Sequence, residues 1–229
     1  MNKVIRGIIF DVDGVVINTE NIHFLSFQKI LKKYNFDLTK EHYKKHFSGK
    51  SIKGGILSLL AEIEIAHNLD LEDFITIFSQ EKINSTLELF KKKLLFYEDT
   101  ISFIKKVKKG NIKLKQLGVI SPNPKLAFTT GLENVLLHEV LKHYNLLNLI
   151  EVVVTADKYI ESKPNPECYN TTLSLMELKS ENVFGVEDSP SGIKALNEAN
   201  IFSVGLTTTH RKGELKEAQL IVKSLQEIL

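Results

Sequence analysis

The sequence predicts an α/β protein, with helices on both faces of a parallel sheet and a small all-helical unit inserted after the first strand. Short β-branched runs alternate with amphipathic helices through the second half of the chain, as in parallel sheets. An apolar run at 4–10 starts the chain, and helical periodicity follows it. We therefore expect an α/β core formed by residues 1–17 and 95–229, and a helical cap domain formed by 18–94.

The elements follow in chain order. Residues 4–10 form a buried strand, and apolar side chains then recur at the spacing of a helix face: Phe24, Phe27, Leu31 and Tyr34. Thr39 and Asp70 are placed to cap further helices. Later strands are expected at 114–120, 151–154, 183–187 and 201–205. Helices are expected near 100–109, 125–143, 166–176 and 190–199.

Composition excludes several classes of function. With 30 Lys and Arg against 28 Asp and Glu, the net charge of +2 creates no field that implies nucleic acid or a membrane as partner. Cys168 is the single cysteine, so no intrachain disulfide forms. No apolar stretch reaches the roughly 18 residues of a membrane span. We expect a cytoplasmic protein and, without a long apolar surface stripe, a monomer.

Two carboxylates end the first strand. Asp11 and Asp13 point the same way in an extended chain, and Gly14 allows a sharp turn after them. Two like charges at the end of a strand repel each other unless a cation lies between them. The pair therefore indicates a metal site with one carboxylate free to attack. A turn-capping Asp11 beside a solvated Asp13 explains this pair alone equally well.

A second acidic pair favours the metal site. Glu187 and Asp188 also follow an apolar strand, before the helix start at Ser189 and Pro190. The carboxyl ends of parallel strands meet at one edge of the sheet. Three or four carboxylates there suit Mg²⁺, which prefers oxygen ligands.

Ser121 and Lys163 are candidates to bind an anion. Ser121 follows the expected strand 114–120, and Lys163 lies in a loop stiffened by two prolines. Taken alone, Ser121 could equally be an ordinary loop serine and Lys163 an ordinary solvated lysine. Beside the carboxylates, they supply a hydroxyl and a cation to hold an anionic group.

Four segments together resemble the motifs of the haloacid dehalogenase superfamily, in order and spacing. They are residues 11–15 (DVDGV), Ser121, 163–166 (KPNP) and 185–192 (GVEDSPSG). The helical insertion, with 19–23 (TENIH) and 47–51 (FSGKS), is similar to the cap of the β-phosphoglucomutase and phosphoglycolate phosphatase branch. The resemblance spans nearly the whole chain.

The resemblance implies a chemistry and assigns roles. Asp11 would attack phosphorus and form a phosphoaspartyl intermediate, and Asp13 would act as acid and base. Ser121 and Lys163 would hold phosphate oxygens. The ligands of Mg²⁺ would be Asp11, the backbone carbonyl of Asp13, Asp188 and Glu187.

Cap positions are less specific. His23 sits beside an apolar helix face, where a packed or exposed histidine is the ordinary reading and a substrate contact the sharper one. Lys50 belongs equally to a solvated turn or to a contact with a substrate anion. Asn18 stands where the family usually has Asp. Ile52 stands where the phosphoglucomutases carry a phosphate-binding Arg, which weakens a mutase assignment.

The leading hypothesis is a Mg²⁺-dependent phosphatase that hydrolyses a small phosphorylated metabolite, such as a sugar phosphate. The alternative is a hexose-phosphate mutase that uses the same intermediate and excludes water. A signalling receiver phosphorylated on Asp11 fits poorly, because receivers are about half this length and lack the helical insertion.

Overall fold

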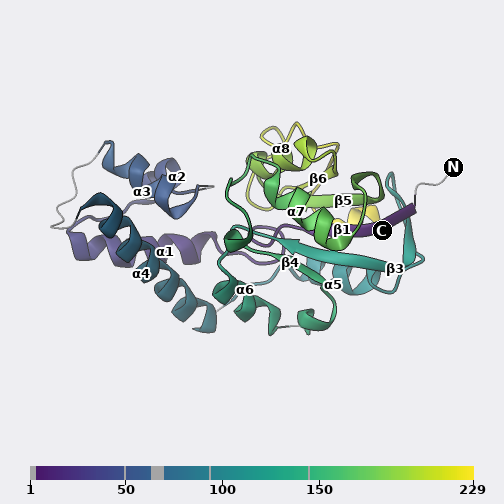
Figure 1. The fold of residues 1–229 in the computed structure, drawn as a ribbon, viewed down its shortest axis with the longest axis horizontal. Coiled ribbons are helices and arrows are strands. Elements are labelled where there is room, and N and C mark those ends of the chain that lie inside the picture. Colours follow the sequence, from purple (N-terminus) through teal and green to yellow (C-terminus); the bar gives the residue numbers. More distant parts are fainter. Residues whose placement is uncertain (1–3, 49, 63–69, 93, 144) are drawn as a thin grey trace. The chain divides into compact units, whose positions relative to one another are not determined.

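The computed structural model describes residues 4–48, 50–62, 70–92, 94–143 and 145–229 (Figure 1). The chain divides into two compact units. Unit 1 comprises Met1–Asn18 and Leu95–Leu229, and unit 2 comprises Thr19–Leu94. Gly49, within the cap segment 47–51, lies outside the described residues.

Unit 1 is built on a sheet that the described residues form from seven strands. The strands are β1 (Val4–Phe10), β2 (Lys113–Leu114), β3 (Gly118–Thr129), β4 (Val152–Val154), β5 (Val183–Glu187), β6 (Phe202–Leu206) and β7 (Leu220–Val222). Their order is β2-β3-β1-β5-β6-β7, with β4 paired to β3. All pairs are parallel except β2 with β3. The predicted α/β class is confirmed.

Helices cover both faces of this sheet because neighbouring strand residues point to opposite sides. The helices are α5 (Glu98–Val107), α6 (Asn134–Leu141), α7 (Glu167–Met176) and α8 (Pro190–Glu198) (Figure 1). Ile9 of β1 packs in a buried cluster with Tyr169 of α7 and Leu196 of α8. The next residue, Phe10, meets Phe103 of α5 edge to face, with ring centroids 6.3 Å apart.

Strand β3 differs from the prediction. The expected strand 114–120 is divided by a turn at 115–117 into parts of β2 and β3, and the first part of the expected helix 125–143 is wrong, because β3 runs through to Thr129. Its pairing with β1 jumps from Ile120 to Lys125, so residues 121–124 form a bulge. Pro122 and Pro124 lack the N–H that a ladder needs, which reads in sequence as a strand end. The short strand β7 and the antiparallel pairing of β2 with β3 were not predicted.

Unit 2 contains the helices α1 (Glu20–Leu31), α2 (Lys40–His46), α3 (Ile52–Leu60) and α4 (Leu71–Lys92). As expected, Thr39 caps α2 by accepting the N–H of His42, and Asp70 accepts two N–H groups at the start of α4. Its buried core combines Ile and Leu side chains with aromatic residues, among them Phe27, Phe47, Phe74 and Phe78.

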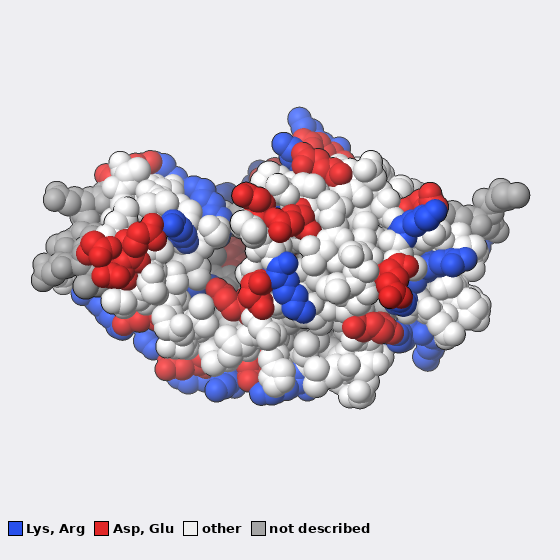
Figure 2. Space-filling view, viewed as in Figure 1, with Lys and Arg blue, Asp and Glu red and all other residues white. Residues whose placement is uncertain are grey.

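The surface carries both signs of charge. On the face in Figure 2, acidic and basic side chains are interspersed over each unit, in keeping with the small net charge. Among the helices of the described residues, none is both long and apolar enough to cross a membrane.

Candidate active site

Asp11 is the first residue after β1, and the sheet buries it. Its N–H donates to Val186 O at 3.0 Å, which continues the pairing of β1 with β5. Asp11 is 6% exposed. The apolar strand thus delivers a carboxylate to the carboxyl edge of a central strand, where ligands bind in parallel sheets.

Glu187 and Asp188 come from the end of the neighbouring strand β5. Both are buried. One oxygen of Glu187, Oε2, accepts the N–H groups of Asp188 and Ser189 at 3.1 and 3.2 Å and the Ser189 hydroxyl at 3.0 Å. A Cβ on Gly192 would lie 1.8 Å from Glu187 Oε1, so the first turn of α8 leaves room for this carboxylate only with glycine there.

The two strand ends bring three carboxylates together. Asp11, Glu187 and Asp188 each offer an oxygen, and these oxygens lie within 4.8 Å of one another. The strand ends therefore meet as the sequence predicts. Asp13 is half-buried in the loop after β1, and its charge contributes to raising the pKa values of Asp11 and Asp188.

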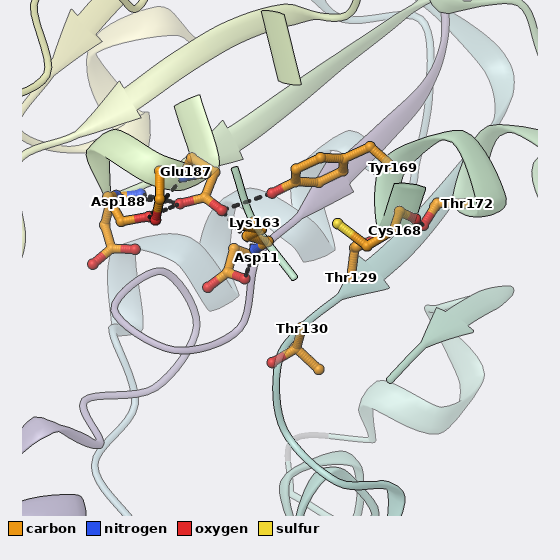
Figure 3. A network of polar contacts seen from close by, with 12 residues as sticks. Asp11, Thr129, Thr130, Lys163, Cys168, Tyr169, Thr172, Glu187 and Asp188 are labelled. Carbon is orange, nitrogen blue, oxygen red and sulfur yellow. Dashed lines mark hydrogen bonds and ion pairs between the residues drawn. The ribbon is translucent and has the colours of Figure 1, made fainter. Parts of the chain in front are cut away.

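Lys163 lies between two of these carboxylates (Figure 3). Its Nζ donates to Asp11 Oδ1 at 2.5 Å and to Glu187 Oε1 at 2.6 Å. Nζ also lies 5.1 Å from the ring centroid of Tyr169, whose hydroxyl donates to Glu187 Oε1 at 2.7 Å. The lysine therefore lies inside the acidic cluster, beside the carboxylates where the sequence places a cation for an anionic group, and its contact with phosphate stays a prediction.

The cluster carries more negative than positive charge. Burial raises the pKa of Asp11 well above its usual value, against the pull of Lys163, and the other carboxylates add to the increase. Burial and the charge of Glu187 raise the pKa of Asp188 to about 8. Raised carboxyl pKa values mean that the ionised forms lack enough positive charge nearby.

Glu187 and Lys163 behave differently from the two aspartates. Burial alone would raise the pKa of Glu187, but the charge of Lys163 and the hydrogen bonds from Lys163 and Tyr169 lower it. Burial alone would lower the pKa of Lys163, but Asp11 and Glu187 raise it well above its usual value. Lys163 and Glu187 are therefore a charged pair, and Asp11 and Asp188 remain to be compensated.

A divalent cation fits this donor set. Three buried carboxylates face one ammonium group, which leaves an excess of negative charge suited to a hard cation with oxygen ligands. Both oxygens of Glu187 already accept hydrogen bonds, so Asp11 and Asp188 are the better direct ligands.

Ser121 is not brought to this cluster. It lies in the bulge of β3, beside the pairing of Ile5 with Ile120, whereas the cluster follows the pairing of Phe10 with Phe128 at the other end. The first residue after β3 is Thr130 (Figure 3), and its side chain is fully buried. Its Oγ1 accepts the N–H of Leu132 at 3.1 Å.

Sequence reasoning missed Thr130, although a signal was present. Leu126-Ala127-Phe128 is an apolar run that ends in Thr-Thr-Gly, the same pattern of strand and polar turn as in β1 and β5. Thr129, one residue earlier, points to the other face, where its hydroxyl lies 2.5 Å from that of Thr172 in α7.

The two cap candidates lie in unit 2. His23 is half-buried in α1, and its N–H donates to Thr19 O at 2.8 Å. Lys50 is exposed, and its Nζ donates to Lys45 O at 3.1 Å and to Ser58 Oγ at 3.0 Å. Their contact with a substrate stays a prediction.

Comparison with known proteins agrees with this geometry. Residues 8–206 match the family model of haloacid dehalogenase-like hydrolases. The chain belongs to this family of enzymes, and the predicted resemblance is confirmed. The strand ends, the acidic cluster and the lysine all lie within the matched range.

Individual relatives indicate which enzymes of this family the chain is similar to. The chain is 28% identical over 196 residues to a phosphorylated carbohydrates phosphatase from Thermotoga maritima, covering 86% of this chain and 82% of that protein. It is 43% identical over 82 residues to validoxylamine A 7'-phosphate phosphatase from Streptomyces hygroscopicus subsp. limoneus, but this covers only 36% of this chain and 38% of that protein. The crystal structure of β-phosphoglucomutase from Clostridium difficile shares the fold, with a TM-score of 0.81, 24% identity and coverage of 98% and 93%.

Proposed function

We propose that this protein is a Mg²⁺-dependent phosphatase that hydrolyses a small phosphorylated metabolite, a sugar phosphate, through a phosphoaspartyl intermediate on Asp11. The observation that carries the proposal is the buried cluster in which Lys163 contacts Asp11 and Glu187 while Asp188 closes the acidic triad. A single cluster supplies a nucleophile, a fixed positive charge and ligands for a cation.

Asp11 is the nucleophile in this proposal. Its carboxylate oxygen forms a bond to phosphorus as the bond from phosphorus to the substrate's ester oxygen breaks. Asp13 gives a proton to that leaving oxygen. It then takes a proton from the water that attacks the phosphoaspartate, which releases inorganic phosphate and restores both side chains.

Two further groups hold the transferring phosphoryl group. The Lys163 ammonium group is fixed beside Asp11 by burial and by Glu187, so it can meet a phosphate oxygen without reorganising. Thr130 replaces Ser121 in the proposed role of hydroxyl donor, because it ends the strand next to β1.

Mg²⁺ would be held by Asp11, Asp188 and the backbone carbonyl of Asp13, with Glu187 supporting the set. When bound, the ion would offset negative charge on the transferring phosphoryl group. The raised pKa values of Asp11 and Asp188 support this assignment, since bound positive charge would favour their ionised forms.

The substrate class rests on the relatives. The Thermotoga protein, aligned over most of both chains, is named for phosphorylated carbohydrates, and the Streptomyces protein is also named as a phosphatase. The β-phosphoglucomutase structure is only 24% identical in sequence, so its similarity supports the fold and not the reaction. The mutase alternative is therefore not favoured.

The test is a phosphate-release assay on the purified full chain. A panel of sugar phosphates is incubated with Mg²⁺ and, in parallel, with EDTA. We expect steady release of inorganic phosphate that EDTA abolishes and that Asp11→Asn lowers by at least a hundredfold. Release that persists in Asp11→Asn would refute Asp11 as nucleophile. Isomerisation of a hexose phosphate that needs a trace of bisphosphate would favour the mutase instead.

A further inference from the structure

The loop after β6 contacts both acidic loops. Strand β6 pairs with β5 up to Glu187 and Gly205, so the next residues lie beside the cluster. The hydroxyl of Thr208 donates to the carbonyl oxygen of Gly14, next to Asp13. The hydroxyl of Thr209 donates to Asp188 Oδ2.

The Thr209 hydroxyl has a second partner. His210 Nδ1 lies 2.8 Å from Thr209 Oγ1. A hydroxyl has a single proton to donate, and an ionised carboxylate can only accept. A carboxylate that holds a cation is ionised, so Thr209 must give its proton to Asp188, and the Thr209 oxygen must then accept from His210. The proton of the neutral ring must then be on Nδ1.

We propose that His210 and Thr209 are positioning residues, which hold Asp188 toward the cation through hydrogen bonds from His210 Nδ1–H to Thr209 Oγ1 and from Thr209 Oγ1–H to Asp188 Oδ2. The inference rests on the proposed function in taking Mg²⁺ as that cation. Neither residue would touch substrate or metal.

The exposure of Thr209 explains why a hydrogen bond from His210 would matter. Thr209 is exposed, and Thr209 and His210 line a cavity of about 710 Å³ whose walls also include Lys223. A hydroxyl at such a position can turn toward water, which would leave Asp188 without its partner. A second hydrogen bond, from His210, fixes the direction of the hydroxyl. Groups that orient metal ligands in this way commonly change metal affinity 10–100-fold when removed.

The first measurement is Mg²⁺ affinity by calorimetry. We expect Thr209→Val to bind Mg²⁺ about 10–100-fold more weakly and Thr209→Ser to stay within about threefold of the wild-type protein. The matched control is Thr207→Val in the same loop, because the Thr207 hydroxyl donates to Val222 O at 3.5 Å and not to an acidic residue. His210→Phe should weaken binding, and His210→Asn, whose amide can replace the ring N–H, should weaken it less.

The second measurement is the position of the ring proton by ¹⁵N NMR, at about pH 9, where histidine is usually neutral. It is made with and without Mg²⁺, and His210→Asn identifies the His210 signals among those of seven histidines. We expect the Nδ1–H form in wild type and its loss in Thr209→Val. A ring protonated on Nε2, or equal Mg²⁺ affinity in wild type and Thr209→Val, would overturn the inference.

Failure of the proposed function has a different signature. If wild type bound no Mg²⁺ and released no phosphate, the phosphatase proposal would fall. The position of the ring proton, and its response to Thr209→Val, would still show whether His210 donates to Thr209, because that measurement needs no metal.

Discussion

Lys163 is the one cation among the described residues that forms ion pairs with the acidic cluster. Its side chain is 15% exposed and pairs with two carboxylates that are 8% and 1% exposed. Removing one partner from such a network leaves buried charges uncompensated, which costs more than the pair contributes. The stability of unit 1 and its chemistry therefore depend on the same side chain.

Lys163→Met should lower the free energy of unfolding by about 3 kcal/mol in EDTA, and by less with Mg²⁺, which would offset part of the uncompensated negative charge. Urea unfolding measures both values. The control is Lys194→Met, whose exposed pair with Glu198 spans 3.9 Å and should contribute less than about 1 kcal/mol. Equal stability of Lys163→Met and wild type in EDTA would contradict an excess of negative charge in the cluster.

Position 14 accepts only glycine without strain. Its φ is +76°, and a Cβ there would lie 2.0 Å from Asp188 Oδ2. We expect Gly14→Ala to displace Asp188, weaken Mg²⁺ binding at least tenfold and destabilise the fold by about 1–3 kcal/mol. Calorimetry and thermal unfolding give the two numbers. Gly213→Ala, where nothing lies within 4 Å of the added Cβ, should change neither.

At the scale of elements, β1 and β5, which have no internal proline, were predictable, and β3, which contains two, was not. Strands β1 and β5 match their predicted ranges. Each is a mostly apolar run with a clear end, since Asp11 follows β1 and Glu187 is the last residue of β5. Strand β3 contains two prolines in a bulge, and local pattern cannot show that pairing resumes beyond them. The acidic cluster and Lys163 could therefore be found from sequence. Thr130 was missed because the end of β3 was placed too early, and Thr209 and His210 depended on which strand ends are neighbours.

The proposed role of Thr130 as hydroxyl donor can be tested by comparing the activities of Thr130 and Ser121 variants. Thr130→Val should lower kcat for phosphate release at least tenfold, because the proposed hydroxyl donor is lost while the side-chain volume is kept. Ser121→Ala should leave kcat within about twofold, since it lies in the bulge at the far end of β3. Steady-state kinetics on both variants decide this. The reverse ranking would restore the serine to the site.

At the scale of the whole molecule, each unit has a core of its own. In unit 2, Phe78 is fully buried and packs against Phe74, with ring centroids 5.8 Å apart. In unit 1, Cys168 of α7 lies in the buried cluster that also contains Ile9 and Leu196. Burial raises the pKa of its thiol to about 11, so the thiolate is scarce at neutral pH. Cys168 is thus a natural probe for the opening of unit 1.

We expect Phe78→Ala to lower the stability of unit 2 by about 3–5 kcal/mol without making Cys168 reactive. Heating is followed by helical circular dichroism and, in parallel, by thiol labelling at pH 8. The helical signal should show an earlier first transition, and labelling should begin at the wild-type temperature. Ile77→Ala, at a position 44% exposed on the same helix, is the control and should shift neither. Labelling that moved together with the first transition would show that the units unfold as one.

The central place of β1 has a consequence for biosynthesis. This strand is made before its two neighbours, β3 and β5, which follow the helical insertion in the sequence and end at Thr129 and Glu187. The nascent chain therefore carries this mostly apolar strand without both of its partners until Glu187 has been added, while the insertion, whose contacts are local, can already fold. Chaperone dependence during translation should accordingly be greatest before β5 emerges.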